Sequence, residues 1–295
     1  MESVLIIERS EHDARHLQQF VVQAGFECMP VSNGCVAESP DNRKCSLILT
    51  SGSPVAADFG PFVRSLGERF PRVPVVMVTG PNGISTRDAL QSGVTGCVPH
   101  CSLASDLAWT LQTILVSGPL AGSGVDTRGG VAEAICHTID NSPELLPLVI
   151  DQIRQRLERW PFPDPMEVVR VMVALSESLD NALYHGNLEL NSELRQGDGR
   201  AWRDECQRRQ STAPYCDRKI RLQAVFGDQS AEFIIRDEGP GFDPLSQVDC
   251  TQSQHKERCS GRGLLLMRMY MDDVRFNPVG NQVTLVKHHP RAAGP

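Results

Sequence analysis

The sequence lacks a basic charge excess, long apolar runs and paired cysteines, and each absence excludes a class of protein. Its formal net charge is −7, so it does not carry the positive charge that neutralises a nucleic-acid backbone. Its apolar stretches, such as residues 73–78, are far shorter than the ~20 residues that cross a bilayer. We therefore expect neither nucleic acid nor a membrane as a direct partner.

The ten cysteines are scattered and form no CxxC pair, so we interpret them as reduced thiols. Cys97 with Cys101, and His255 with Cys259, have helical spacing but lack a second pair of ligands. They do not predict a zinc site. The first residues, Met1-Glu2-Ser3, have no basic signal-peptide pattern, and we expect a cytoplasmic protein.

A chain of 295 residues that is 40% hydrophobic and 22% charged is expected to fold as two globular domains. Residues 1–118 alternate short apolar runs with amphipathic stretches, which predicts βα units and a doubly wound parallel sheet. A Gly- and Ser-rich linker is expected at 119–130, a second domain at 131–289 and a tail at 290–295. Strands are predicted at 4–7, 46–49, 73–78 and 94–98, and a helix through Leu103, Leu107, Leu111 and Ile114.

The second domain is predicted to contain strands near 131–139, 218–226, 231–237 and 273–277, a helix opened by Asn141-Ser142-Pro143, and a longer helix after the proline-rich 161–165. In the longer helix Glu177, Asn181 and His185 recur every four residues. That side is expected to be free for chemistry, while the other side packs. The packing stripe is predicted to be Val168, Met172, Leu175, Leu179 and Leu183.

The segment RDEGPGFDP, residues 236–244, follows a strand and resembles the adenine-binding box of GHKL ATPases. The resemblance implies that Asp237 accepts a hydrogen bond from the adenine amino group. It implies that Gly239 and Gly241 let the backbone approach the base. The alternative is an ordinary Gly-Pro turn after a strand.

The segment SESLDNALYHGN, residues 176–187, resembles the helical N box of the same superfamily. The resemblance implies Asn181 as a magnesium ligand, since an amide oxygen can join water and phosphate oxygens around this ion. It implies Glu177 as the general base. The alternatives are a solvated polar helix face for these two residues and a packing or capping role for His185.

The segment SGRGLLLMRMYMDDV, residues 260–274, opens a helix with two glycines and resembles the second glycine box. The resemblance implies that Gly261, Arg262 and Gly263 contact phosphate, and amides at a helix start favour this. The alternative is a plain helix cap. On the last strand the resemblance makes Thr284 a neighbour of the adenine.

The motifs occur in the family order over about 131–289, which implies a GHKL two-layer α/β sandwich that binds ATP and magnesium. The final HGN of the N box, a short lid at 245–260 and the ending VTLVKHH are similar to anti-sigma-factor serine/threonine kinases. These act on anti-sigma-factor antagonist domains and are often dimeric. Histidine kinases need a helical hairpin, for which residues 119–141 are too short. The insertion at 188–216 has no assigned role.

Residues 1–118 resemble a response-regulator receiver domain, through strand spacing and Thr79 at a strand end. The active site of that family is missing. Glu8 is followed by Arg9 where an acidic pair is expected, and Thr50-Ser51 stands where the aspartyl nucleophile should be. His100 stands near the expected lysine. We predict a pseudo-receiver that acts through binding or dimerisation, the alternative being a purely stabilising domain.

The favoured function is a regulatory serine/threonine kinase that uses ATP and magnesium to phosphorylate a partner protein, an anti-sigma-factor antagonist domain, in bacterial signalling. The second hypothesis is an ATP-gated module that sequesters a sigma factor or another partner without catalysis. A histidine-kinase-like protein is the least favoured reading.

Overall fold

In the computed structural model, contacts divide the chain into two compact units. The first contains the described residues up to 115 together with 133–139, and the second the described residues from 140 on. The expected linker at 119–130, lid at 245–260 and tail at 290–295 lie outside the described residues. The structure describes residues 2–8, 10–33, 45–51, 59–80, 83–115, 133–160, 162, 164–191, 199–227, 229–243 and 262–289.

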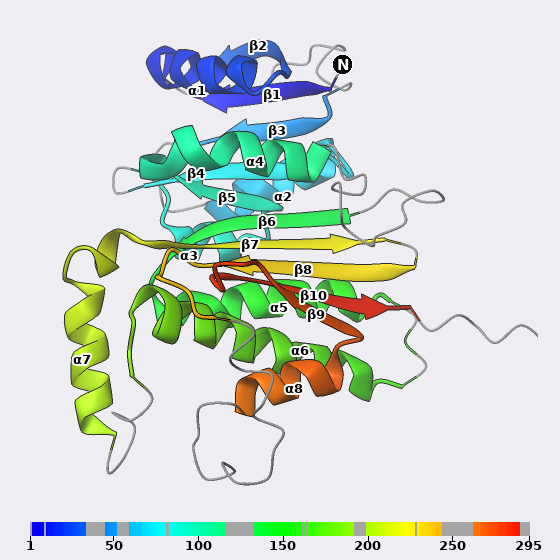
Figure 1. Cartoon of the computed structure of the whole chain (residues 1–295). Helices are drawn as coiled ribbons and strands as arrows, with labels where there is room; N and C mark the ends of the chain where they lie inside the picture. Colours follow the sequence, from blue (N-terminus) through cyan, green and yellow to red (C-terminus); the bar gives the residue numbers. More distant parts are fainter. Residues whose placement is uncertain are drawn as a thin grey trace, which may run out of the picture. The chain divides into compact units, whose positions relative to one another are not determined.

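The first unit is built on parallel strands in the order β2-β1-β3-β4-β5-β6 (Figure 1). The order 2-1-3-4-5 is that of flavodoxin-like doubly wound folds. The predicted doubly wound, receiver-like domain is therefore confirmed. The strands are β1 (Ser3–Glu8), β2 (Glu27–Asn33), β3 (Leu47–Thr50), β4 (Val75–Thr79), β5 (Gly96–Pro99) and β6 (Glu133–Asp140).

Strands β3, β4 and β5 are buried along their whole length, as parallel strands are when helices cover both faces of a sheet. Helices α1 and α4 pack against each other over one face, with Ile6, Leu49 and Leu107 in the shared core. The helices of this unit are α1 (Glu11–Gln23), α2 (Phe59–Arg69), α3 (Thr86–Gln91) and α4 (Leu103–Leu115), with a 3-10 turn, η2 (His100–Ser102).

Strand β2 is not among the strands predicted from the sequence, and its segment ECMPVSN contains Pro30. Proline removes a backbone donor and is tolerated in a sheet only at an edge or a bulge. In this unit β2 is the outermost strand and its pairing with β1 shifts register after Leu5. The edge position of β2 therefore explains how this strand accommodates a proline.

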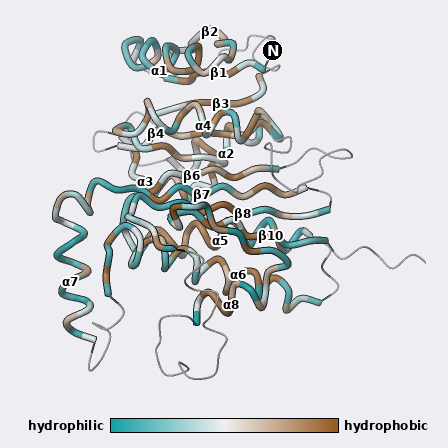
Figure 2. The backbone as a smooth tube through the Cα atoms, in the orientation of Figure 1, coloured by the Kyte–Doolittle hydropathy of each residue, from teal (hydrophilic) through white to brown (hydrophobic). Residues whose placement is uncertain are grey.

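The second unit has four antiparallel strands in the order β7-β8-β10-β9, with α5, α6 and α8 beside the sheet (Figure 1). This arrangement confirms the expected two-layer sandwich. Figure 2 shows α7 as largely hydrophilic. The elements are η3 (Pro143–Leu145), α5 (Leu146–Leu157), α6 (Met166–Asp180), η4 (Asn181–Asn187), α7 (Arg200–Gln210), η6 (Tyr215–Asp217), β7 (Lys219–Phe226), β8 (Ser230–Arg236), α8 (Arg262–Tyr270), β9 (Asp273–Phe276) and β10 (Gln282–His288).

The predicted packing stripe of α6 is correct only in its second half. Leu175, Leu179 and Leu183 are fully buried, whereas Val168 and Met172 are only half-buried. The core-facing side of the first half carries Val171 and Ala174, which are fully buried and one helical turn apart, and further core residues continue the same row. The first half of α6 is therefore apolar on two sides. Val171 and Ala174 face the core, whereas Val168 and Met172 of the predicted stripe lie on another side of the helix.

Strand β6 covers most of the strand predicted at 131–139, and it pairs in parallel with β5. This pairing groups its residues with the first unit, although the sequence placed them at the start of the second domain. Within the described part of the chain, no helix has the length and hydrophobicity of a membrane span.

Candidate functional site

The centre of the candidate site is the helical segment formed by α6 and η4. Glu177 and Asn181 lie one turn apart on it, both half-buried, at the point where the α-helix passes into a π-helical turn. Residues four apart share a helix face, and π-helical turns occur frequently at functional sites. The structure thus brings together the two side chains for which the sequence predicts catalysis and magnesium binding.

The start of α8 faces these two side chains. A Cβ atom placed on Gly263 would lie 2.7 Å from Glu177 Oε2 and 3.6 Å from Asn181 Nδ2. The second glycine box therefore reaches the N box with no room for a side chain between them. Arg262, the first residue of α8, is exposed at the same end, and Gly261 lies outside the described residues. Free amides at a helix start favour phosphate.

Asp237 follows β8 and lies at the other end of η4. A Cβ on Gly186 would come within 2.4 Å of its carboxyl carbon, and Gly239 N donates to Asp237 Oδ1 at 2.8 Å. Burial, with only 8% of the residue exposed, raises the pKa of Asp237 to about 6, against smaller lowering effects from the Gly239 amide and the Arg218 charge. The carboxylate is thus an acceptor in a largely desolvated position.

Gly239 and Gly241 allow close packing within the protein itself. A Cβ on Gly239 would lie 2.3 Å from Gly186 O. Gly241 has a positive φ of 76°, and its Cβ would lie 2.1 Å from Val279 O. The expected role was close approach to an adenine, and the described contacts supply a different reason for both glycines.

The structure does not bring Thr284 to Asp237. In the ladder of β8 and β10, Thr284 is opposite Ile234 and Val283 is opposite Ile235. Asp237 N donates to Asn281 O and so continues this register by one pair. Because side chains alternate along a strand, Asp237 shares a face with Val283, and Thr284 points to the other face. The expected adenine contact of Thr284 is therefore not supported.

Asn187 is the site residue that the sequence reading left without a role. It is fully buried, its Nδ2 donates to Asn141 Oδ1 at 2.6 Å, and its Oδ1 accepts from Glu238 N at 2.7 Å. This amide therefore fixes the residue directly after Asp237 to the end of the N box. The sequence feature that marks Asn187 is the tripeptide HGN, which was interpreted above only as a family resemblance.

The inserted helix α7 packs against the end of the N box. Trp202 of α7 is 9% exposed, and its ring contacts Tyr184 at 5.6 Å and His185 at 6.0 Å. Arg209 donates to the carbonyl oxygens of Leu188 and Glu189. His185 also bonds through Nδ1 to Leu190 O. These contacts agree with a packing role for His185 and make α7 a support for the N box.

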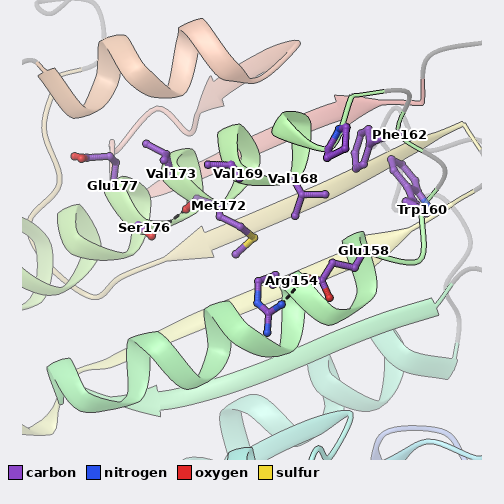
Figure 3. Close-up of a pocket in the computed structure, with 11 residues that line it drawn as sticks. Arg154, Glu158, Trp160, Phe162, Val168, Val169, Met172, Val173, Ser176 and Glu177 are labelled. Carbon is purple, nitrogen blue, oxygen red and sulfur yellow. Dashed lines mark hydrogen bonds and ion pairs between the residues drawn. The ribbon is translucent and has the colours of Figure 1, made fainter.

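A hollow of about 760 Å³ extends along α6 on the side of Glu177 away from Asn181 (Figure 3). We call it the α6 groove. Its lining is mainly apolar, with the aromatic pair Trp160 and Phe162 at one end and Glu177 at the other. The lining residues are Arg154, Glu158, Trp160, Phe162, Pro165, Val168, Val169, Met172, Val173, Ser176 and Glu177.

In the first unit, the position of a receiver active site holds a closed hydrogen-bonded pair. Glu8 is buried at the end of β1 and accepts hydrogen bonds from the amide and, at 2.7 Å, the hydroxyl of Ser51. Burial raises the pKa of Glu8 above its ordinary value. Thr79 bonds to Thr86 at 3.1 Å, and His100 is exposed. A neutral hydroxyl thus replaces the expected nucleophile.

No group of three or more His, Cys, Asp or Glu side chains that could hold a metal ion occurs among the residues whose positions are described. Magnesium would instead fit the site through the Asn181 amide oxygen, with the remaining positions taken by phosphate oxygens and water. The proximity of Asn181 to the start of α8 places this amide where phosphate is expected.

Solved structures that are similar to part of this chain include the following two. A response regulator receiver domain protein from Clostridium thermocellum is 14% identical, with a TM-score of 0.34, and the match covers 40% of this chain and 96% of that one. A protein described as a pilus assembly protein (cpaE) from Burkholderia thailandensis E264 is 18% identical, with a TM-score of 0.31, over 38% and 99% of the two chains.

No curated protein sequence matches the chain. The sequence pattern of the histidine kinase-like ATPase domain matches residues 139–287, which is half of the chain. The match includes α5, α6, η4, α7, α8 and strands β7 to β10. It therefore contains the adenine-binding box, the N box and the second glycine box. The chain therefore belongs to the histidine kinase-like ATPase domain family, with its ATPase domain joined to a receiver-like domain.

Proposed function

We propose that this protein is an ATP-dependent serine/threonine protein kinase of the anti-sigma-factor kinase type, and that its substrate is an anti-sigma-factor antagonist domain. The observation that carries the proposal is the position of Glu177 directly against Gly263. A carboxylate is thereby held beside a helix start suited to phosphate, with the Asn181 amide one turn away.

Glu177 acts in this proposal as the general base. It accepts the proton of the serine or threonine hydroxyl while the oxygen forms a bond to the γ-phosphorus and the bond from that phosphorus to ADP breaks. Asn181 would hold magnesium, which neutralises charge on the phosphate oxygens when bound. The amides at the start of α8 orient the phosphates.

The adenine end of the nucleotide is assigned to Asp237, whose carboxylate accepts the hydrogen bond of the adenine amino group. Two hydrogen bonds, from Gly239 N to Asp237 Oδ1 and from Glu238 N to Asn187 Oδ1, keep the carboxylate in one position. A preorganised acceptor of this kind discriminates against a base without the amino group, because the buried carboxylate would remain unpaired.

Glu177→Ala tests the catalytic role. We expect phosphate transfer from labelled ATP to the partner to fall by about 10²- to 10⁴-fold, the usual contribution of a general base. ATP affinity should change little, because the role of Glu177 is to accept the proton of the acceptor hydroxyl. Asp180→Asn is the matched control, since Asp180 is an exposed acid on the same helix, and it should retain transfer.

Other outcomes separate the alternative functions. If the partner binds in an ATP-dependent manner, and neither phosphate transfer nor an effect of Glu177→Ala is detected, the protein is a nucleotide-gated binding module. Partner and ATP must then change each other's affinity by the same factor. Acid-labile phosphate on a histidine would instead indicate a histidine-kinase-like reaction.

A further inference from the structure

The α6 groove runs from the aromatic pair Trp160 and Phe162 to Glu177 (Figure 3). We propose that it binds the segment of the partner protein that carries the accepted serine or threonine, with a large apolar side chain of that segment packed against the rings of Trp160 and Phe162. The proposal rests on the kinase function proposed above, and it adds the binding site and the chemical class of the acceptor.

The proposed binding sites follow one another along one helical segment. Gly186 contacts Asp237, and Glu177 contacts the start of α8 at Gly263. Glu177 and Gly186 are nine positions apart, which corresponds to about 14 Å at ~1.5 Å per residue. A nucleotide with its adenine at Asp237 and its phosphates at Gly263 therefore lies along η4 and the end of α6. Its last phosphate points toward Glu177.

The α6 groove begins at Glu177 and continues through Ser176 toward the start of the helix, away from the nucleotide. A hydroxyl that reacts at Glu177 must approach from a side that the nucleotide leaves free. The groove is such an approach, since Glu177 belongs both to its lining and to the contact with Gly263. Because the groove is continuous with Glu177, we expect the segment bound in it to carry the hydroxyl from which Glu177 accepts the proton.

The exposed face of α6 is apolar. Val169, Val173 and Glu177 form one row at four-residue spacing, and Val169 is 48% exposed. Met166, at the start of the helix, is 51% exposed. A surface helix normally presents polar residues on the side away from the core, and a contiguous exposed apolar face indicates a binding surface.

The charged side chains of the groove favour an apolar occupant as well. Arg154 forms an ion pair with Glu158 on the wall opposite α6, and also with Asp151. The positive charge at this wall is therefore already matched by carboxylates. An apolar anchor gains from burial against the aromatic pair and the valines.

The length of the groove sets the spacing expected in the partner. Pro165 and Glu177 are twelve residues apart on a helical segment, which corresponds to about 18 Å. An extended peptide advances ~3.3 Å per residue, so about five residues separate the accepted hydroxyl from the apolar anchor. The proposed substrate segment is thus a serine or threonine with an aromatic or large aliphatic residue about five positions away.

A binding measurement with labelled synthetic peptides tests the proposed spacing. The full chain is first saturated with a non-hydrolysable ATP analogue. Each peptide carries one serine and one phenylalanine, and the phenylalanine is moved through every position on both sides. We expect fluorescence anisotropy to give the tightest binding at a separation of about five residues. The affinity there should be about tenfold higher than for the peptide with serine in place of phenylalanine.

Val169→Asp should abolish this advantage, because it places a charge in the apolar groove. Met269→Asp is the matched control, since Met269 is a 63% exposed apolar residue of α8 outside the groove, and it should bind as wild type does. Failure of every peptide to bind, or binding that depends neither on phenylalanine position nor on Val169, overturns the proposal. So does a wild-type dimer that Val169→Asp dissociates.

The same peptides with labelled ATP separate this proposal from the proposed function. If binding depends on the spacing but no phosphate is transferred, the groove is still a site that binds a peptide segment. The kinase function, and the role of that segment as phosphate acceptor, are then overturned. Transfer to a partner that is unaffected by Val169→Asp retains the kinase and overturns the groove. If both proposals hold, Val169→Asp raises the KM for the peptide about tenfold and leaves kcat nearly unchanged.

Discussion

At the scale of single residues, the adenine contact proposed for the buried carboxyl of Asp237 predicts that nucleotide binding depends on pH. Its pKa of about 6 lies above the ordinary 3.8 because burial disfavours the charged form. Without nucleotide, Asp237 therefore contributes stability that increases as the pH falls through 6 toward 4. In the proposed contact the ionised carboxylate accepts the hydrogen bond of the adenine amino group, so we expect nucleotide binding to weaken over the same range.

We therefore expect ATP affinity to fall by about tenfold between pH 7 and pH 5, relative to Asp237→Asn. The variant lacks the titrating group, and it also corrects for the titration of ATP itself. Calorimetric titration over this pH range gives both affinities. A constant ratio of the two affinities across the range would contradict a carboxylate contact with the base.

Gly239 provides a second residue-scale prediction. The Cβ of Gly239→Ala would lie 2.3 Å from a backbone oxygen of Gly186, so the adenine box or the N box must move. Overpacking of this kind costs ~1–3 kcal/mol, and the melting temperature should fall by roughly 3–10 °C. Gly67→Ala is the control, because nothing lies within 4 Å of its Cβ and alanine is the better helix former. Circular dichroism melting should show no loss for Gly67→Ala.

At the scale of elements, the insertion helix α7 is predicted to hold the end of the N box in place. Trp202→Ala removes the ring contacts to Tyr184 and His185. Amide hydrogen exchange should then become faster both in α7 and in residues 184–190, since the two segments lose a shared packing interface. Gln207→Ala changes an exposed side chain of the same helix and should leave exchange unchanged. Faster exchange restricted to α7 would show that the N box does not depend on it.

At the scale of the whole molecule, phosphoryl chemistry is assigned to the second unit alone. The receiver-like unit has Ser51 bonded to the buried Glu8 where an aspartyl nucleophile would be needed. We expect no labelling of the chain by labelled acetyl phosphate under conditions that label an ordinary receiver domain. Hydroxylamine-sensitive label on the chain would identify an aspartyl phosphate and contradict this assignment.

The sequence by itself determined the two fold classes and the main parts of the candidate site. Buried parallel strands appear as short apolar runs, as at β3 and β4, and one periodic helix carried Glu177 and Asn181. Glycine-containing boxes have local signatures because close approach and helix starts restrict the residue type at single positions, as at Gly263. These features depend on neighbours in the chain, so they can be read without the fold.

Only the tertiary structure decided the features that depend on contacts between distant segments. The edge position of β2 tolerates Pro30, and strand register moves Thr284 to the face opposite Asp237. The pairing of Asn187 with Asn141 and Glu238 joins residues up to 51 positions apart. The α6 groove likewise exists because Val168 and Met172 face α5 and solvent rather than the sheet. Periodicity marks an apolar side chain, but only packing decides which surface it meets.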